Sequence, residues 1–152
     1  MCCRRRRYRI CLATDDGRDY IDLGKIAKMG TKEKDFLTEK IIACAYKVHS
    51  TLGPGFNENI YHNALKIALE DQGLNYQTEK SFGISFQDKS IGRFRLDLVI
   101  EDRIVTELKA LTGNIPAVFE SQVLSYLKAS GYKVGLLINF GNKSCQIRRL
   151  MI

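Results

Sequence analysis

The chain has 152 residues, the length of a single domain, and 45% of them are hydrophobic while 27% are charged. This composition excludes general disorder, and no apolar run approaches the roughly 18 residues of a membrane-spanning helix. The formal net charge of +7 favours a polyanionic partner, but the charge is unevenly placed. Residues 1–34 carry a net charge of +5, whereas residues 35–152 carry only +2.

Residues 1–34 show neither helical nor strand periodicity, and they include four consecutive arginines at positions 4–7. Such a run of like charges favours solvated coil, so we predict a poorly ordered basic extension before a folded domain over residues 35–152. The arginines form either a phosphate-contacting arm or a tail without a role.

Five cysteines lie at positions 2, 3, 11, 44 and 145. Their number is odd and the first residues do not read as a secretory signal, so we expect reduced thiols and a cytoplasmic protein without a membrane anchor. The sequence has no Cys-x-x-Cys pattern, which argues against a zinc or iron–sulfur site. Cys44 falls in a helical apolar pattern and is expected to be a small core residue.

Two helices are predicted at the start of the patterned region. Thr38 is the expected N-cap of the first, which runs to about Leu52 and is ended by Gly53-Pro54-Gly55. Asn57 is a favourable N-cap for the second, which is predicted to stop at Gly73. The residues expected to face the core are Ile41, Ile42, Ala45, Val48 and Leu52 in the first helix, and Ile60, Tyr61, Leu65, Ala68 and Leu69 in the second.

The hydrophobic period then changes from helical to alternating. Phe82, Ile84 and Phe86 alternate with polar or small residues, which predicts a half-buried strand. The order of these elements, α-α-β-β-β-α-β-β, predicts one α/β domain with a mixed central sheet flanked by helices. The remaining elements are a turn at 88–90, a strand over 93–100, a turn at 101–103, a strand over 104–110, a helix over 117–130 closed by Gly131, a strand over 134–140 covered on both faces, a turn at 141–143 and a strand over 146–151.

Three charged residues, Asp97, Glu107 and Lys109, lie in or beside apolar strands. Because positions i and i+2 of a strand share a face, Glu107 and Lys109 are expected to point the same way and Leu108 the other. If residues 101–103 form a three-residue loop, the numbers of opposed residues sum to 204 and Asp97 lies opposite Glu107. A two-residue loop would instead place the two carboxylates on opposite faces, unless a bulge restores the parity.

With the three-residue loop, the two carboxylates face each other about 5 Å apart at their Cβ atoms. Like charges at this distance are costly unless a cation lies between them. Carboxylate oxygens without a Cys or His cluster favour a hard ion such as Mg²⁺ or Mn²⁺, beside which a lysine can orient a water or stabilise charge on a phosphate. The alternative is a solvent-facing side of the sheet, on which Asp, Glu and Lys pair with one another.

Further candidates lie on the predicted helices. Gln122 and Tyr126 are four residues apart and share a helix face, which can contact a phosphate or a base or can be an exposed flank. Glu58 lies in the first turn of the second helix, where a carboxylate also stabilises the helix N-terminus. Tyr61 is expected in the core, and His49 is a hydrogen-bonded core histidine or, alternatively, a site residue.

The segment Gly55-Phe56-Asn57-Glu58-Asn59-Ile60-Tyr61 reads Gly-x-x-Glu-x-x-Tyr and resembles the GxxExxY protein family of small prokaryotic-type proteins. The resemblance runs from about Leu37 to the C-terminus and includes Arg95-Leu96-Asp97-Leu98. That family is in turn similar to the PD-(D/E)xK nuclease superfamily. The predicted element order contains the α-β-β-β-α-β core of that superfamily, so a restriction-endonuclease-like fold is expected.

This resemblance implies a role for each candidate. Asp97 matches the metal-binding aspartate, Glu107-Leu108-Lys109 matches the Glu-x-Lys motif, and Glu58 matches the glutamate of the helix. Gln122 and Tyr126 match the Gln-x-x-x-Tyr signature of the RecB-like and lambda-exonuclease-like branch.

The activity implied is hydrolysis of DNA phosphodiester bonds with Mg²⁺ or Mn²⁺, in which Lys109 positions the attacking water. Implied partners are DNA and, as for other small members, a second copy of the chain or a helicase. Leu96 stands where a proline often precedes the aspartate, and Arg95 and His49 are further site candidates. The alternative function is a non-catalytic module that binds nucleic acid or protein on the same fold.

Overall fold

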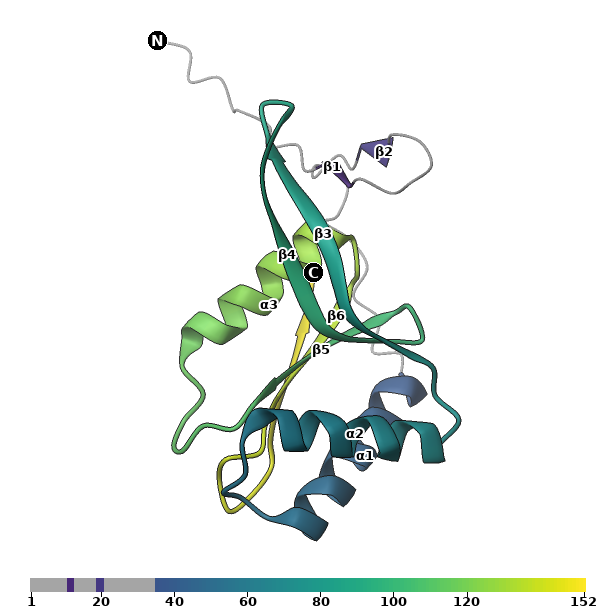
Figure 1. The fold of residues 1–152 in the computed structure, drawn as a ribbon, viewed down its shortest axis with the longest axis vertical. Coiled ribbons are helices and arrows are strands. Elements are labelled where there is room, and N and C mark those ends of the chain that lie inside the picture. Colours follow the sequence, from purple (N-terminus) through teal and green to yellow (C-terminus); the bar gives the residue numbers. More distant parts are fainter. Residues whose placement is uncertain (1–10, 13–18, 21–34) are drawn as a thin grey trace.

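A computed structural model describes residues 11–12, 19–20 and 35–152 of the chain (Figure 1). The two short segments are β1 (Cys11–Leu12) and β2 (Asp19–Tyr20), which pair antiparallel. Both strands lie within the basic extension of residues 1–34, for which poor order is predicted, and the other residues of that extension lie outside this description. In the part of the chain that the structure describes, every helix is too short or too polar to span a bilayer.

The domain over residues 35–152 has the predicted element order and a mixed five-stranded sheet. The strands lie in the order β3-β4-β5-β6-β7, and only β5 and β6 are parallel. The elements are α1 (Phe36–Leu52), α2 (Glu58–Asp71), β3 (Tyr76–Phe86), β4 (Lys89–Ile100), β5 (Ile104–Lys109), α3 (Ala117–Ser130), β6 (Val134–Asn139) and β7 (Gln146–Met151). The α/β fold with this sheet is consistent with the restriction-endonuclease-like architecture that the sequence predicts.

Two layers of helix cover the two faces of the sheet. Residues of α1 and α2 share one hydrophobic cluster with Leu136 of β6, and residues of α3 share the other with Leu137. Successive residues of β6 therefore pack into opposite clusters, which confirms the prediction that this strand is covered on both faces.

The start of α1 differs from the prediction. Its N-cap is Asp35 rather than Thr38, because the Asp35 carboxylate accepts hydrogen bonds from the Leu37 amide at 3.2 Å and from the Thr38 hydroxyl at 2.9 Å. Thr38 is buried in the first turn and supports the cap instead of being it. The predicted cap of α2 is confirmed, since the Asn57 side chain accepts from the Ile60 amide at 3.2 Å.

Other boundaries also differ from the prediction. β3 begins at Tyr76, before the alternating residues 82–86, and β4 begins at Lys89 instead of residue 93, because the two strands pair along their whole length up to the tight turn. The β3–β4 turn is Gln87-Asp88 rather than 88–90, because both residues have positive φ and form a two-residue hairpin turn. The strands end at Lys109 and Asn139, one residue earlier than predicted. Ile60 is exposed although its spacing placed it in the core, since the inward stripe of α2 is centred on Tyr61 and Leu65.

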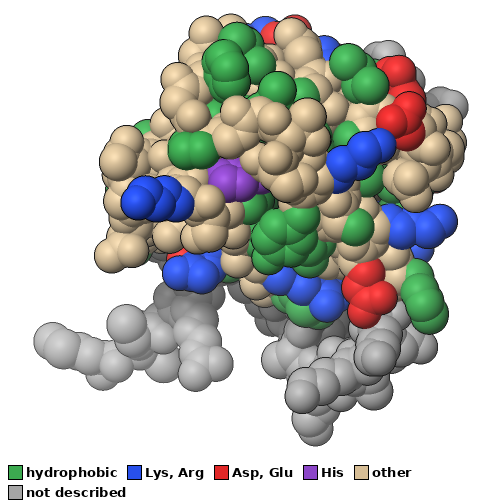
Figure 2. All heavy atoms as spheres, turned by 90° about the horizontal axis from the view of Figure 1, so that it is seen from below, with side chains coloured by type: hydrophobic (Ala, Val, Ile, Leu, Met, Phe, Trp, Pro, Cys, Tyr) green, Lys and Arg blue, Asp and Glu red, His purple; other side chains and the backbone are tan. Residues whose placement is uncertain are grey.

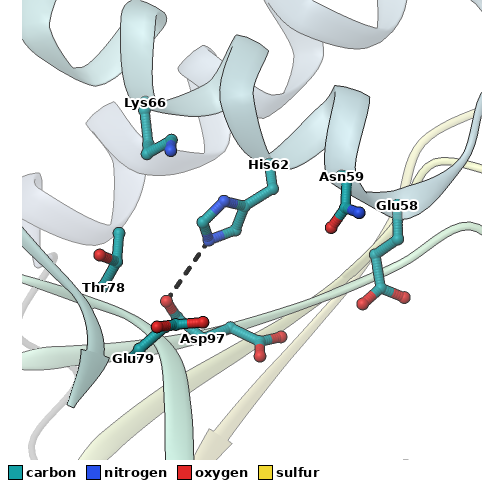
Figure 3. Close-up of a pocket in the computed structure, with 7 residues that line it drawn as sticks. All are labelled: Glu58, Asn59, His62, Lys66, Thr78, Glu79 and Asp97. Carbon is teal, nitrogen blue, oxygen red and sulfur yellow. Dashed lines mark hydrogen bonds between the residues drawn. The ribbon is translucent and has the colours of Figure 1, made fainter.

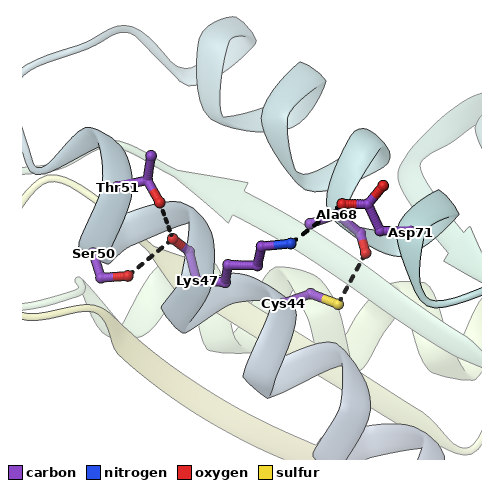
Figure 4. A network of polar contacts seen from close by, with 6 residues as sticks. All are labelled: Cys44, Lys47, Ser50, Thr51, Ala68 and Asp71. Carbon is purple, nitrogen blue, oxygen red and sulfur yellow. Dashed lines mark hydrogen bonds and ion pairs between the residues drawn. The ribbon is translucent and has the colours of Figure 1, made fainter.

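Polar contacts join α1 to α2 beside their apolar interface (Figure 4). The Cys44 thiol is buried as predicted and donates to the Ala68 carbonyl at 3.4 Å. Closer to the surface, the Lys47 ammonium lies 3.2 Å from the Asp71 carboxylate. These contacts fix the direction of α2, whose first turn carries Glu58.

Tyr61 holds the loop that precedes Glu58. Its ring is fully buried and stacks on Phe140 with centroids 4.7 Å apart. Its hydroxyl donates to the Gly53 carbonyl at 2.6 Å and accepts from the Phe56 amide at 3.2 Å. The tyrosine of the Gly-x-x-Glu-x-x-Tyr segment is therefore a core residue, as predicted, that closes the turn between α1 and α2.

We expect Tyr61→Phe to lower the free energy of unfolding by about 0.5–1.5 kcal/mol, because it removes the hydroxyl that bonds both the Phe56 amide and the Gly53 carbonyl. Urea denaturation of the two proteins measures this difference. Tyr46→Phe, which alters an exposed tyrosine of α1, is the matched control and should have no effect. Equal stability of wild type and Tyr61→Phe would show that the hydroxyl does not hold the loop.

Candidate active site

The β4–β5 pairing has the register that a shared carboxylate site requires. The pairs Leu98↔Thr106, Val99↔Val105 and Ile100↔Ile104 all sum to 204, and residues 101–103 form the three-residue turn. The ladder stops one pair before Asp97, whose carboxylate instead accepts from the Leu108 amide at 3.4 Å. The Asp97 side chain therefore lies against β5 at the Glu-x-Lys segment.

A local distortion of the β3–β4 ribbon places Asp97. Leu96 packs into the α3-side cluster and Leu98 into the α1/α2-side cluster, although residues two apart in a regular strand share a face. Across the ribbon, Glu79 has a left-handed φ of 54° and lies between the paired residues Thr78 and Lys80. Both strands are thus distorted at Asp97, which takes this residue out of regular alternation.

Glu107 is a buried carboxylate with one unsatisfied oxygen. The residue is only 4% exposed; its Oε1 accepts from Lys109 Nζ at 2.8 Å, while Oε2 is buried without a hydrogen-bond partner. Burial and then the charge of Asp97 raise the pKa of Glu107 to about 7, against the opposing effect of Lys109. The neighbouring side chains therefore neutralise the negative charge of this carboxylate only in part.

Lys109 extends from the same face of β5 as Glu107, as predicted, and its ammonium lies 5.0 Å from the centre of the Phe119 ring of α3. Leu108 points to the other side, into the α1/α2 cluster. Burial acts to lower the pKa of Lys109, but the contact with Glu107 and the charges of Glu58 and Asp97 raise it above its usual value. The side chain is thus an ammonium at neutral pH and acts as a hydrogen-bond donor.

Glu58 reaches the same place from the first turn of α2. Burial raises the pKa of its carboxyl, Lys109 lowers it and Asp97 raises it again, so the three groups are within electrostatic reach of one another. Glu58 and Asp97 also line a pocket of about 260 Å³ between α2 and the β3–β4 ribbon, across which the side chains of the two layers point toward each other (Figure 3). The other lining residues are Asn59, His62, Lys66, Thr78 and Glu79.

Gln122 and Tyr126 lie together on α3, as their spacing predicts. The Gln122 amide donates to the Tyr126 hydroxyl at 2.5 Å, and the Tyr126 ring stacks on Phe94 with centroids 4.9 Å apart. Phe119, which contacts the Lys109 ammonium, lies on the same helix one turn before Gln122. The structure therefore places them beside the candidate site rather than in direct contact with its carboxylates.

Two further candidates have other surroundings. His49 is buried, and its Nε2 shares a hydrogen bond of 2.8 Å with the Asn142 carbonyl, so it is the hydrogen-bonded core histidine that was expected. The Arg95 side chain is 67% exposed, and its guanidinium lies 3.6 Å from the Glu79 carboxylate.

A family model described as the PD-(D/E)XK nuclease superfamily matches residues 35–150. The chain belongs to this superfamily. The finer resemblance of residues 55–61 to the GxxExxY family stays a prediction, since the matching model describes the superfamily as a whole. No curated protein matches this chain in sequence.

A solved structure, the crystal structure of SSO0001, is also similar to this chain. The two share 22% sequence identity and a TM-score of 0.51, over 75% of this chain and 56% of the other. At this identity the likeness concerns the fold alone, and this chain spans about half the length of that protein.

Nucleases of the PD-(D/E)XK superfamily generally use divalent metals, and the residues present fit such an ion. Within the described residues, no three His, Cys, Asp or Glu side chains are grouped closely enough to hold a metal by themselves. Asp97 and Glu107 nevertheless supply two carboxylates and one buried oxygen without a partner. This suits Mg²⁺, which is usually bound by one or two carboxylates together with water and substrate phosphates.

Two residues that line the pocket from α2, His62 and Lys66, were not among the predicted site residues. His62 Nε2 lies 3.4 Å from the Asp97 carbonyl. The available signal was their spacing, because Glu58, His62 and Lys66 follow one another at intervals of four and so share one face of α2.

Proposed function

We propose that this chain is a nuclease that hydrolyses phosphodiester bonds of DNA with Mg²⁺ or Mn²⁺. The observation that carries the proposal is a buried Glu107 carboxylate whose Oε2 has no hydrogen-bond partner. Asp97 lies near enough to raise its pKa, and the Lys109 ammonium contacts its other oxygen. A solvent-facing sheet surface, the alternative interpretation of these residues, does not agree with the burial of Glu107.

Asp97 and Glu107 would hold the cation, with Glu58 acting directly or through a water. When bound, the ion polarises a phosphoryl oxygen and offsets the charge of the two carboxylates. The protein itself supplies a rigid support, since Glu107 is fixed within the central strand and Asp97 is fixed against the Leu108 amide. This arrangement presents the carboxylates without further rearrangement of the backbone.

Lys109 would donate a hydrogen bond to the attacking water and stabilise the negative charge that develops on the phosphate. Its ammonium is held by Glu107 on one side and by the face of Phe119 on the other. Gln122 and Tyr126 would support this position through α3, whose Phe119 contacts the ammonium. The raised pKa of Lys109 makes it a donor and not the base that deprotonates the water.

The test is cleavage of labelled single- and double-stranded DNA and RNA by the purified chain with Mg²⁺, Mn²⁺ or EDTA. We expect cleavage of DNA with either ion, none in EDTA, and a loss of about a thousandfold or more in Asp97→Asn, equivalent to about 4 kcal/mol of transition-state stabilisation. Glu39→Gln, which neutralises an exposed carboxylate of α1, is the matched control and should keep full activity.

The non-catalytic module predicts a different outcome. DNA binding that is unaffected by Mn²⁺, without cleavage of any of the four substrates, would support that function and contradict the proposal. Calorimetric titration of Mn²⁺ into wild type and Glu107→Gln gives a second readout, because the proposal expects binding only in the wild type.

A further inference from the structure

The outer part of the β3–β4 hairpin is a two-stranded arm. Lys80↔Leu96 to Phe86↔Lys89 are paired within the hairpin, whereas β4 pairs with β5 only from Leu98 onward. Figure 1 shows this arm extending past the rest of the sheet, away from α1 and α2. Because β4 is continuous, the arm leads directly into Asp97.

One face of the arm is fixed to α3. Phe82 and Phe94 are a cross-strand pair with ring centroids 5.5 Å apart. Phe94 stacks on Tyr126, and Phe82 meets Tyr132 edge to face at 6.2 Å. Residues of the opposite parity therefore face away from α3.

That outer face carries two arginines beside two small residues. The cross-strand neighbours are Arg93↔Gly83 and Arg95↔Ser81. Both arginines are exposed, and a Cβ at Gly83 would meet nothing within 4 Å. The contact of Arg95 with Glu79, at 3.6 Å between two exposed side chains, holds it only weakly. Among the residues that the structure describes, both arginine side chains thus lie at the surface.

The two arginines lie close to the candidate site in the sequence of β4. Along β4, Arg95 precedes Asp97 by two residues and Arg93 precedes it by four. Beyond Asp97, the pocket continues to His62 and Lys66 of α2 (Figure 3). Basic side chains therefore extend from both sides of the acidic centre.

The arm carries an excess of positive charge. Residues 80–96 carry four basic and one acidic side chain, a net charge of +3, whereas all of residues 35–152 carry +2. On the face seen in Figure 2, by contrast, Lys and Arg side chains lie apart from one another among apolar and acidic ones. Residues 121–152 are also basic, with five basic and no acidic side chains. The arm thus has the local charge to meet a polyanion, and it is the basic segment that leads along β4 into Asp97.

We propose that the outer face of the β3–β4 arm binds the phosphate backbone of the DNA substrate, with Arg93 and Arg95 contacting phosphates next to the bond cleaved at Asp97. This inference rests on the proposed nuclease function and adds the surface by which the substrate is held. Arginine suits this role because its planar guanidinium can bind a phosphate through two hydrogen bonds.

The experiment measures fluorescence anisotropy of a labelled 30-nucleotide single strand and of the matching duplex in EDTA, at several salt concentrations. We expect Arg93→Gln/Arg95→Gln to bind at least about tenfold more weakly than wild type at low salt. Its plot of log affinity against log salt should be shallower by roughly 1.4 for the single strand or 1.8 for the duplex, as the loss of two phosphate contacts requires. Lys128→Gln/Lys133→Gln removes the same charge from exposed positions at the end of α3 and before β6 and should change neither quantity.

Equal losses in both double variants, or no binding of either probe by the wild type, would overturn the inference. Because binding is measured in EDTA, its result is independent of catalysis. Loss of binding in Arg93→Gln/Arg95→Gln with no cleavage by the wild type would support the binding surface and count against the nuclease. If the wild type cleaves DNA and Arg93→Gln/Arg95→Gln cleaves it with the same kcat/KM, the result would support the nuclease and count against the binding surface.

Discussion

Replacing Glu107 by glutamine should abolish metal-dependent cleavage and, at the same time, stabilise the metal-free protein above neutral pH. Cleavage should fall by about a thousandfold or more, because the variant loses one of the two carboxylates that would hold the ion. The gain in stability has a separate cause. Glu107 is buried near Asp97, and these surroundings raise its pKa from 4.5 to about 7.

The direction of the pH dependence follows from this raised pKa. Between pH 4.5 and 7 the folded protein binds a proton at Glu107 that the unfolded chain has already released. The resulting stability is fully present below pH 4.5 and is lost as the pH rises to about 7. Glutamine has no proton to lose, so the variant should be more stable than wild type by roughly 3 kcal/mol at pH 8.

Urea denaturation in EDTA at pH 5, 6, 7 and 8 measures this difference. Glu39→Gln, at an exposed position in the first turn of α1, is the matched control and should follow the wild-type profile at every pH. Parallel profiles for wild type and Glu107→Gln would mean that the folded protein does not disfavour the charged carboxylate. Retained cleavage in Glu107→Gln would contradict its proposed role in holding the metal.

The parts of this structure that depend on local periodicity could be predicted from the sequence. The alternation around Leu108 gave the shared face of Glu107 and Lys109, and the length of the 101–103 turn fixed the register with β4. Each of these features involves residues close in sequence, whose relative positions are set by the geometry of one strand or one hairpin.

The features that depend on tertiary contacts could not be predicted in the same way. The side chains of β4 change face at Asp97, opposite Glu79, which has a left-handed backbone conformation. That conformation is uncommon for glutamate, so no sequence pattern predicts the change of face. Asp35 and Thr38 are both good caps, and only the packing of α1 shows that Thr38 is buried. The pocket position of His62 likewise arises from how α2 lies over β4, which the helix period alone leaves open.

Replacing Lys109 by methionine should abolish cleavage and destabilise the protein, but the loss of stability should be large only above neutral pH. Removing one partner of a buried ion pair typically costs about 3–5 kcal/mol, because the other charge is left without compensation. Glu107 can avoid this cost by keeping a proton. Its pKa is already about 7, and it should rise further once the lowering effect of Lys109 is gone.

At pH 6 the Glu107 carboxyl is then largely neutral in both proteins, and Lys109→Met should be only slightly less stable than wild type. Above pH 7 wild-type Glu107 has released its proton while the variant still holds it, so the difference should grow by up to about 1.4 kcal/mol per pH unit. The double variant Glu107→Gln/Lys109→Met separates charge from packing, since it removes both charges and should lack this pH dependence. An equal loss of stability at pH 6 and pH 8 in Lys109→Met would assign the cost to the lost contact with Phe119 instead of to the uncompensated carboxylate.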